Sequence, residues 1–283
     1  MKRWLLSTLL VSLTLWAGCS EPKTTLERIK KNGVVRVGYS NDAPFAYKES
    51  DGRLTGEAIE VARVLFKRIG VPKVQGVLVK FDSLIDELKA GKFDVIAAGM
   101  FITPERAQHI DFAEPTYCLG QAFLVKNGNP KYLHSYDDVR KQTSVKLAIV
   151  EGAVQEGFAR QANIPEGQIV SCGSTDEAYA ALCEGKADAL ALSSLSINAL
   201  VKRSQDGSVE RAIPFTALQR KGKTQLNYGA FGFRKEDSDL RRLINKEIEQ
   251  FLGSKEHLKL IEPFGFVASD LPKDVSAADL SIE

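Results

Sequence analysis

The stretch FDSLIDELKAGKFDVIAAGMFITPER, residues 81–106, carries the pattern that decides the fold. Its residues 84–90 have the apolar spacing of a helix, and Gly91 follows as a typical helix end. In residues 94–98 (DVIAA) four apolar residues follow Asp94, which is typical of a buried strand. Residues 103–105 (TPE) then signal the start of another helix. Helix, buried strand and helix in succession predict an α/β domain.

The residues before this stretch continue the alternation. Residues 34–39 (VVRVGY) alternate like a strand, and residues 57–69 have helix spacing that ends at Gly70. Residues 74–81 predict a second strand. The order strand, helix, strand, helix, strand favours a mainly parallel sheet with helices on its faces.

The same pattern returns further along the chain. Strands are predicted at residues 145–150, 169–172 and 187–192, with helices at residues 154–161 and 176–183 between them. The chain therefore contains two α/β units, and we expect each to carry its own sheet.

Two β-rich runs near the junctions, residues 120–126 and 228–234, would suit a pair of connecting strands, and a helix over residues 240–252 follows. This order predicts that the chain leaves lobe 1, builds lobe 2 and returns. The expected limits are 26–119 for the first part of lobe 1, 120–229 for lobe 2, and 230–283 for the return to lobe 1 and the C-terminal tail.

The N-terminus has the features of a secretory signal. Lys2 and Arg3 precede an apolar run over residues 4–16, and the small residues Ala17 and Gly18 follow. The run is shorter than the roughly 20 residues that span a bilayer, although a membrane anchor or a buried first helix would use the same residues. We expect residues 1–18 to be a signal peptide.

Ala-Gly-Cys at residues 17–19 resembles the end of a bacterial lipobox, from which Trp16 departs because a small aliphatic residue is usual there. We expect a lipid on Cys19, with ordinary cleavage near this site as the alternative, and a polar tether over residues 19–25. The mature protein would then be periplasmic, or a cell-surface lipoprotein anchored through Cys19.

Composition excludes several classes of function. Thirty-eight Lys and Arg against 36 Asp and Glu give a net charge of +2, which favours neither nucleic acid nor a strongly acidic partner. His109, His134 and His257 are scattered, and no metal-ligand pair or nucleophile elbow stands out. We expect no metal, no cofactor and no enzymatic activity.

Three cysteines remain in the mature chain, Cys118, Cys172 and Cys183, and their spacing is not that of a zinc site. Cys172 and Cys183 could pair in an oxidising compartment. Alternatively, all three are small core residues.

Five segments resemble the extracellular solute-binding proteins of ABC importers, in the amino-acid-binding family 3. They are VVRVGYSNDAPFAY (34–47), LTGEAIEVA (54–62), the stretch 81–106, IDFAEPTY (110–117) and YGAFGFRKED (228–237). The resemblance implies a type II periplasmic-binding-protein-like fold, with a two-strand hinge about which two lobes close on a ligand. It also implies docking on a membrane permease, with a monomer as the expected state.

The resemblance places ligand-binding residues at the carboxyl ends of the strands. The arginine that matches Arg106 grips the ligand carboxylate in the family, and a planar guanidinium can hold both oxygens at once. A surface arginine is the alternative. Phe101 stands where Ser or Thr is common, and Phe45 and Phe81 match aromatic positions. With Gly99 between them, they predict an aromatic box for a diffuse cation, although core packing also explains a phenylalanine.

Asp42 could pair with a cationic N–H group, or could simply form a turn. Family members place an aspartate for the α-ammonium group near Ser193, and the change to serine argues against a free primary α-amine because an unpaired buried ammonium is costly. Ala153 and Val154 open a helix whose N–H groups can meet an anion.

Together these residues predict a compact zwitterionic ligand, and ectoine or hydroxyectoine fits. NDAPFAY, AAGMFITPER and GQAFLVKNGNP also resemble the ectoine-binding component of Ehu-type importers. Betaine, a proline-like imino acid or a polar amino acid is the alternative. A cyclohexadienyl-dehydratase-like enzyme and a sensor module are further alternatives, because the family hosts enzymes and receptor ectodomains.

Overall fold

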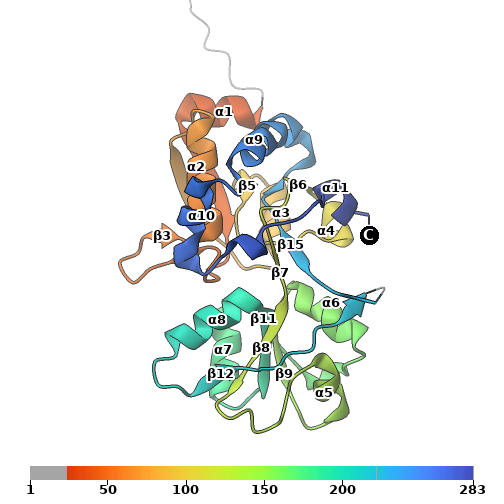
Figure 1. Cartoon of the computed structure of the whole chain (residues 1–283). Helices are drawn as coiled ribbons and strands as arrows, with labels where there is room; N and C mark the ends of the chain where they lie inside the picture. Colours follow the sequence, from red (N-terminus) through yellow and green to blue (C-terminus); the bar gives the residue numbers. More distant parts are fainter. Residues whose placement is uncertain (1–23, 221, 283) are drawn as a thin grey trace, which may run out of the picture.

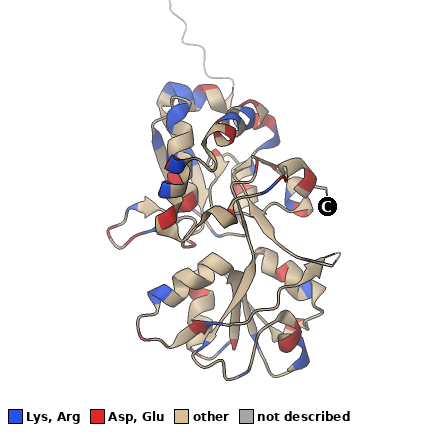
Figure 2. Ribbon diagram, viewed as in Figure 1, with Lys and Arg blue, Asp and Glu red and all other residues tan. Residues whose placement is uncertain are grey.

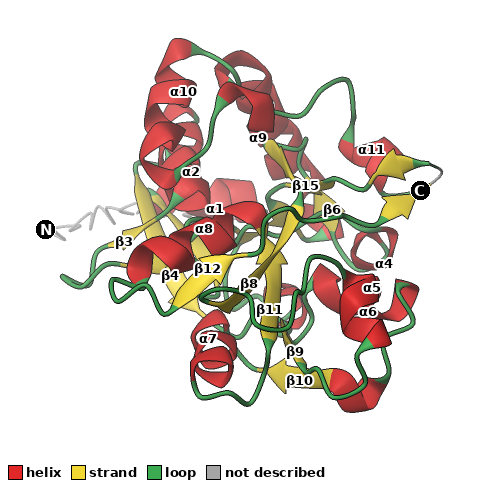
Figure 3. Ribbon diagram, turned by 60° about the horizontal axis from the view of Figure 1, so that its bottom comes forward, coloured by secondary structure: helices red, strands yellow, loops and turns green. Residues whose placement is uncertain are grey.

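The computed structural model describes residues 24–220 and 222–282, which form two lobes, one above the other in Figure 1. Each lobe is built on a five-stranded sheet flanked by helices (Figure 3), so the expected two-lobed α/β fold is confirmed. The expected signal peptide, Cys19 and most of the expected tether lie outside the described residues.

Lobe 1 has the strand order β4-β1-β5-β16-β6. Strands β4, β1 and β5 are parallel, and β16 is antiparallel to both of its neighbours. The strands are β1 (Val34–Tyr39), β4 (Lys73–Leu78), β5 (Val95–Ile96), β6 (Asp111–Phe112) and β16 (Gly232–Phe233), with a hairpin of β2 (Tyr47–Lys48) and β3 (Leu54–Thr55). The helices are α1 (Thr25–Asn32), α2 (Glu57–Arg68), α3 (Leu84–Lys89), α4 (Pro104–Ala107), α9 (Ser238–Phe251), α10 (Lys255–Ile261) and α11 (Ala277–Leu280), with 3₁₀ turns η2 (Lys235–Asp237), η3 (Glu262–Phe264) and η4 (Ala268–Asp270).

Lobe 2 has the strand order β10-β9-β11-β8-β12, in which β8 is antiparallel to both of its neighbours. Along β8, Ala122 and Leu124 pack into one core cluster, and Phe123 and Val125 into another, because successive strand residues point to opposite faces. The strands are β8 (Gln121–Lys126), β9 (Leu147–Val150), β10 (Ile169–Cys172), β11 (Ala189–Ser193) and β12 (Val209–Arg211), with a hairpin of β13 (Gln219–Arg220) and β14 (Lys223–Thr224). The helices are α5 (Tyr136–Lys141), α6 (Val154–Gln161), α7 (Thr175–Cys183) and α8 (Ser194–Arg203), with the 3₁₀ turn η1 (Glu166–Gln168).

The strands that connect the lobes are β7 (Tyr117–Leu119) and β15 (Asn227–Gly229), which pair antiparallel between the two sheets (Figure 1). The predicted positions of the connecting strands, residues 120–126 and 228–234, were therefore wrong, because both strands begin earlier in the chain. Most of the first run is β8, a strand of the lobe 2 sheet, and the second run holds the end of β15 and then β16. A β-rich run alone does not distinguish a short crossing strand from the buried sheet strand that follows it.

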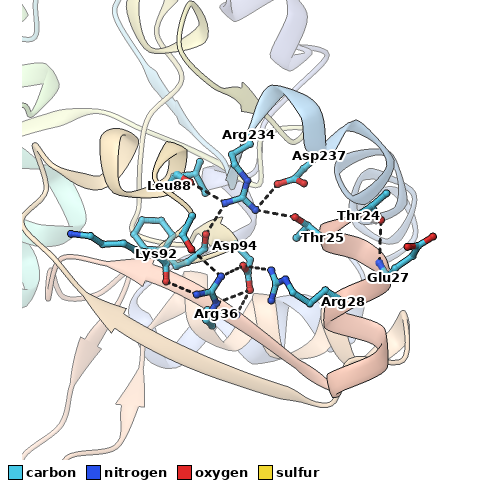
Figure 4. A network of polar contacts seen from close by, with 12 residues as sticks. Thr24, Thr25, Glu27, Arg28, Arg36, Leu88, Lys92, Asp94, Arg234 and Asp237 are labelled. Atoms are coloured by element: carbon cyan, nitrogen blue, oxygen red, sulfur yellow. Dashed lines mark hydrogen bonds and ion pairs between the residues drawn. The ribbon is translucent and has the colours of Figure 1, made fainter. Parts of the chain in front are cut away.

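Ion pairs centred on the buried side chains of Asp94 and Arg234 hold the end of lobe 1 remote from lobe 2 (Figure 4). Asp94, 0% exposed, accepts hydrogen bonds from Arg36 Nη2 at 2.7 Å and from Arg28 Nη2 at 2.5 Å. Arg234 donates to the carbonyl of Phe93 at 2.8 Å and pairs with Asp237 at 2.7 Å. These contacts fasten α1 and the returning chain to the start of β5.

The three described cysteines are free thiols, so the pairing of Cys172 with Cys183 does not occur in this structure. Cys172 is buried, but Cys183 is exposed and Cys118 is half-buried, so only Cys172 fits the alternative of a core residue. Within residues 24–220 and 222–282, no helix is long and apolar enough to cross a bilayer, and no group of His, Cys, Asp or Glu could hold a metal ion.

Candidate binding cleft

A narrow cleft lies between the lobes, where loops that follow strands of both sheets meet. It encloses about 40 Å³, room for roughly three water-sized spheres. Its lining includes all nine residues expected from the sequence: Asp42, Phe45, Phe81, Gly99, Phe101, Arg106, Ala153, Val154 and Ser193. The remaining lining residues are Ser40, Val150, Gln155, Gly173, Ser174, Thr175, Leu192 and Ser196.

Arg106 joins the two lobes across this cleft. Thr103 caps α4 by accepting a hydrogen bond from the Arg106 N–H at 3.2 Å, which fixes where the arginine leaves the helix. The guanidinium donates to the Phe101 carbonyl at 2.6 Å and to the Gly152 carbonyl of lobe 2 at 2.9 Å. Burial lowers the pKa of Arg106 to about 10, so the group is still a cation at neutral pH.

Asp42 makes the second polar link between the lobes. Its carboxylate accepts hydrogen bonds from the hydroxyl groups of Thr175 at 3.2 Å and Ser196 at 3.4 Å, both in lobe 2. Burial raises the pKa of Asp42 to about 7, although the two hydroxyl donors oppose this shift. A fixed cation in the cleft would favour the ionised carboxylate.

Aromatic side chains form the lobe 1 wall of the cleft. Phe45 and Phe101 are 2% and 6% exposed, and both pack against Tyr117 of β7, with ring centroids 5.3 and 6.1 Å apart. Phe81 is more accessible, and its ring centroid lies 5.4 Å from the Arg106 guanidinium carbon. Cation–π attraction therefore helps to hold the guanidinium at the cleft.

Two glycines allow the close approaches that shape the cleft. Gly99 has φ +68°, and a Cβ there would overlap the Phe45 ring, so a larger residue would displace the aromatic wall. Gly152 has φ +73°, and a Cβ there would lie 2.8 Å from the Asp82 Cα in lobe 1. The backbones of the two lobes therefore come together at Gly152.

On the lobe 2 side, the cleft is lined by the starts of three helices. Ala153 is the N-cap residue of α6 and has no side chain that can accept its N–H groups. At the start of α8, the Ser193 hydroxyl accepts the Ser196 N–H at 3.1 Å, so Ser193 caps the helix and adds no charge to the cleft. This wall thus offers N–H and O–H groups. Among the described residues that line the cleft, Asp42 alone carries a carboxylate.

Thr175, Ser196 and Tyr117 were missed by sequence reasoning. Thr175 follows β10, so the rule that ligands lie beyond the carboxyl ends of parallel strands would have found it. Ser196 lies inside the first turn of α8, and Tyr117 backs the wall from a connecting strand. The local pattern of the chain carries no signal for either of these two positions.

Comparisons with known proteins agree on the type of fold. The model of a family described as bacterial extracellular solute-binding proteins, family 3, matches residues 35–266. A probable amino-acid ABC transporter periplasmic-binding protein of Sinorhizobium fredii is 35% identical over 255 residues, 89% of this chain and 82% of its own length. The histidine-binding periplasmic protein of Escherichia coli is 28% identical over 260 residues, 90% of this chain and 96% of its own.

Two solved structures have the same architecture. A crystal structure of EhuB in complex with hydroxyectoine has a TM-score of 0.81 and 32% identity, covering 91% of this chain and 97% of its own. An ancestral amino acid-binding protein, described as a precursor of cyclohexadienyl dehydratase, has a TM-score of 0.74 and 31% identity, covering 85% and 99%.

Proposed function

The chain belongs to the bacterial extracellular solute-binding proteins, family 3, and from this premise we propose that it delivers ectoine or hydroxyectoine to an ABC importer. Both solutes carry a carboxylate on a small ring with a delocalised cationic amidine. The proposed ligand-binding residues are the nine expected from the sequence, joined by Thr175 and Ser196.

The observation that carries this proposal is the pairing of one fixed cation with an aromatic wall and one acid. Arg106 presents a guanidinium that can take both carboxylate oxygens. Phe45 and Phe101 form an apolar wall that suits a diffuse cation rather than a compact ammonium group. Asp42 can accept the N–H groups of an amidinium, and its two hydroxyl partners already orient the carboxylate.

The lobe 2 side supports the choice against a free α-amino acid. Ser193 uses its hydroxyl to cap α8, so it cannot neutralise a buried ammonium group there. The likeness to EhuB, solved with hydroxyectoine, adds independent support.

The structure also constrains how a ligand would enter. The lobes are closed, and the guanidinium of Arg106 already donates to the Gly152 carbonyl. A ring-sized ligand needs more room than the cleft offers here, so we propose that the lobes part about β7 and β15 to admit it. In the complex, the ligand carboxylate would replace Gly152 as a partner of Arg106.

The wider assignment follows from the same premise. We propose an extracytoplasmic monomer with lobe 1 at residues 26–119 and 230–283 and lobe 2 at residues 120–229. We further propose a lipid on Cys19 as the anchor and a permease in the cytoplasmic membrane as the partner.

A polar amino acid is the second candidate. It is favoured by the relatives named for amino-acid and histidine binding, and by Asp42, which could hold an ammonium group in place of an amidinium. A dehydratase is less well supported, because such an enzyme needs a placed acid or base. Among the described residues that line the cleft, Asp42 is the one acidic residue and none is a histidine.

Calorimetric titration of the unlipidated mature protein tests the proposal, with ectoine, hydroxyectoine, glycine betaine, proline, glutamine and histidine as ligands. Tight one-to-one binding of ectoine or hydroxyectoine alone is the expected result. Heat with an amino acid and none with ectoine would retain the transport role and overturn the ligand. Recovery of chemically altered ligand after incubation would instead indicate an enzyme.

A further inference from the structure

The end of lobe 1 opposite the cleft carries a concentration of positive charge. Figure 2 shows Lys and Arg gathered over α1 and the far end of α2. This basic end is made of exposed side chains from four segments that meet there: Lys30, Lys31, Lys67, Arg68, Lys73, Lys89 and Lys92.

These segments are neighbours in space as well as in charge. The first residue of β1, Val34, pairs with Lys73 at the start of β4, so the end of α1 lies beside β4. The Arg36 guanidinium donates to the Lys92 carbonyl at 2.9 Å, which brings the end of α3 to the same edge (Figure 4). The basic residues therefore form one surface.

Most of this charge is not neutralised. Among the described residues, Arg68 pairs with Glu256 at 2.7 Å and Lys92 pairs with Glu87. No described carboxylate pairs with Lys30, Lys31 or Lys67, nor with Lys73 or Lys89. Favourable interaction with helix dipoles accounts for lysines in the last turns of α1, α2 and α3, but Lys73 begins a strand. On α5 of lobe 2, by contrast, Asp137 binds both Arg140 and Lys141.

The start of the described chain lies at this same end. Thr24 caps α1, and Cys19 stands five residues before it in the sequence. Five residues reach at most about 18 Å when extended. A lipid on Cys19 would therefore hold α1 within a short distance of the headgroups, where basic side chains are attracted to anionic phospholipid.

We propose that the basic end of lobe 1 is a membrane-facing surface that rests on anionic phospholipid headgroups beside the anchor. The inference adopts the extracytoplasmic location and the anchor at Cys19 from the proposed function, but it uses none of the ligand-binding residues. In this undocked pose lobe 2 points away from the bilayer and the cleft stays accessible to solute, and docking on the proposed permease would require the protein to turn about its anchor.

Vesicle co-sedimentation of the unlipidated mature protein tests this surface. Phosphatidylglycerol mixed equally with phosphatidylcholine is compared with phosphatidylcholine alone, at low and at physiological salt. We expect binding to the anionic vesicles alone, and weaker binding as salt screens the charges.

The decisive variant replaces Lys30, Lys31 and Lys67 by Gln. Each basic residue near an anionic surface contributes roughly fivefold to partitioning, so the triple change predicts roughly hundredfold weaker vesicle binding. The matched control replaces Lys126, Lys131 and Lys202 by Gln, three exposed lysines of lobe 2 that change the net charge equally. We expect the control to bind like the parent.

Equal losses of vesicle binding in the two triple variants would show that binding depends on net charge alone, and would overturn the proposal. Failure of the parent protein to bind anionic vesicles would also overturn it. Ectoine titration of all three proteins separates this inference from the proposed function. Vesicle binding without ectoine binding would remove the ligand assignment and leave the membrane-facing surface intact.

Discussion

Replacing Arg106 by Ala tests the centre of the proposed site. The guanidinium has two carbonyl partners in the closed structure, Phe101 at 2.6 Å and Gly152 at 2.9 Å. The Gly152 carbonyl lies in lobe 2, so this bond must break or lengthen when the lobes part. In the proposed complex the ligand carboxylate takes its place and keeps the lobes together.

The expected loss can be worked from these contacts. A hydrogen bond to a charged group contributes about 1.5–3 kcal/mol, and the guanidinium can form two with a carboxylate. Without Arg106 the carboxylate would enter the closed cleft with no cationic side chain among the described residues that line it. A loss of about 3 kcal/mol follows, which is roughly a hundredfold rise in Kd. Arg106→Lys should lie in between, because it keeps the charge and loses the planar fork.

Calorimetry with ectoine on the parent, Arg106→Ala and Arg106→Lys measures these differences directly. Arg160→Ala is the control, since Arg160 is an exposed arginine at the last turn of α6 and does not line the cleft. A Kd for Arg106→Ala within threefold of the parent would refute the assignment of the carboxylate clamp.

Three further predictions concern acids and a glycine. Because burial raises the pKa of Asp42 to about 7 and a cationic ligand prefers its ionised form, ectoine affinity should fall as pH drops below 7, with proton release on binding. Calorimetric titrations in buffers of different ionisation enthalpy measure the number of protons released on binding. Asp42→Asn should abolish this proton release and most of the ectoine affinity. Glu57 is buried, with one oxygen lacking a described partner, and burial raises its pKa to about 8. Its folded pKa exceeds its unfolded value of about 4.5, so its contribution to stability declines as pH rises from 4.5 through 8. Glu57→Gln should flatten the dependence of Tm on pH over that window, and an unchanged slope would contradict this reading. Gly99→Ala should weaken ectoine binding at least tenfold, because its φ of +68° and the Phe45 ring leave no room for Cβ; Gly207→Ala, at a loop glycine with φ +66° and open space around its Cβ position, controls for backbone strain alone.

Local sequence patterns were sufficient for the two α/β units. The predicted strands at residues 94–98 and 187–192 overlap β5 and β11, because the apolar residues that follow Asp94 and Asp188 are buried on both faces of a sheet. The predicted helix start at Thr103 and the predicted helix end at Gly91 also agree with the structure, because capping depends on residues within one turn. The predicted positions of the connecting strands were wrong because these strands depend on distant contacts. The pairing of β7 with β15 joins residues far apart in the chain.

The candidate site also combines features that the sequence predicts with features that only the tertiary structure sets. The sequence by itself indicated the residues that line the cleft, from Asp42 and Phe45 to Arg106, because the resemblance to family 3 places them in segments that follow a strand or in the first turn of a helix. Tertiary structure alone decided what those side chains meet: the hydroxyls of Thr175 and Ser196 on Asp42, and the Gly152 carbonyl on Arg106. These contacts cross from one lobe to the other, and no local pattern encodes a distance that is set only when two separately folded lobes close.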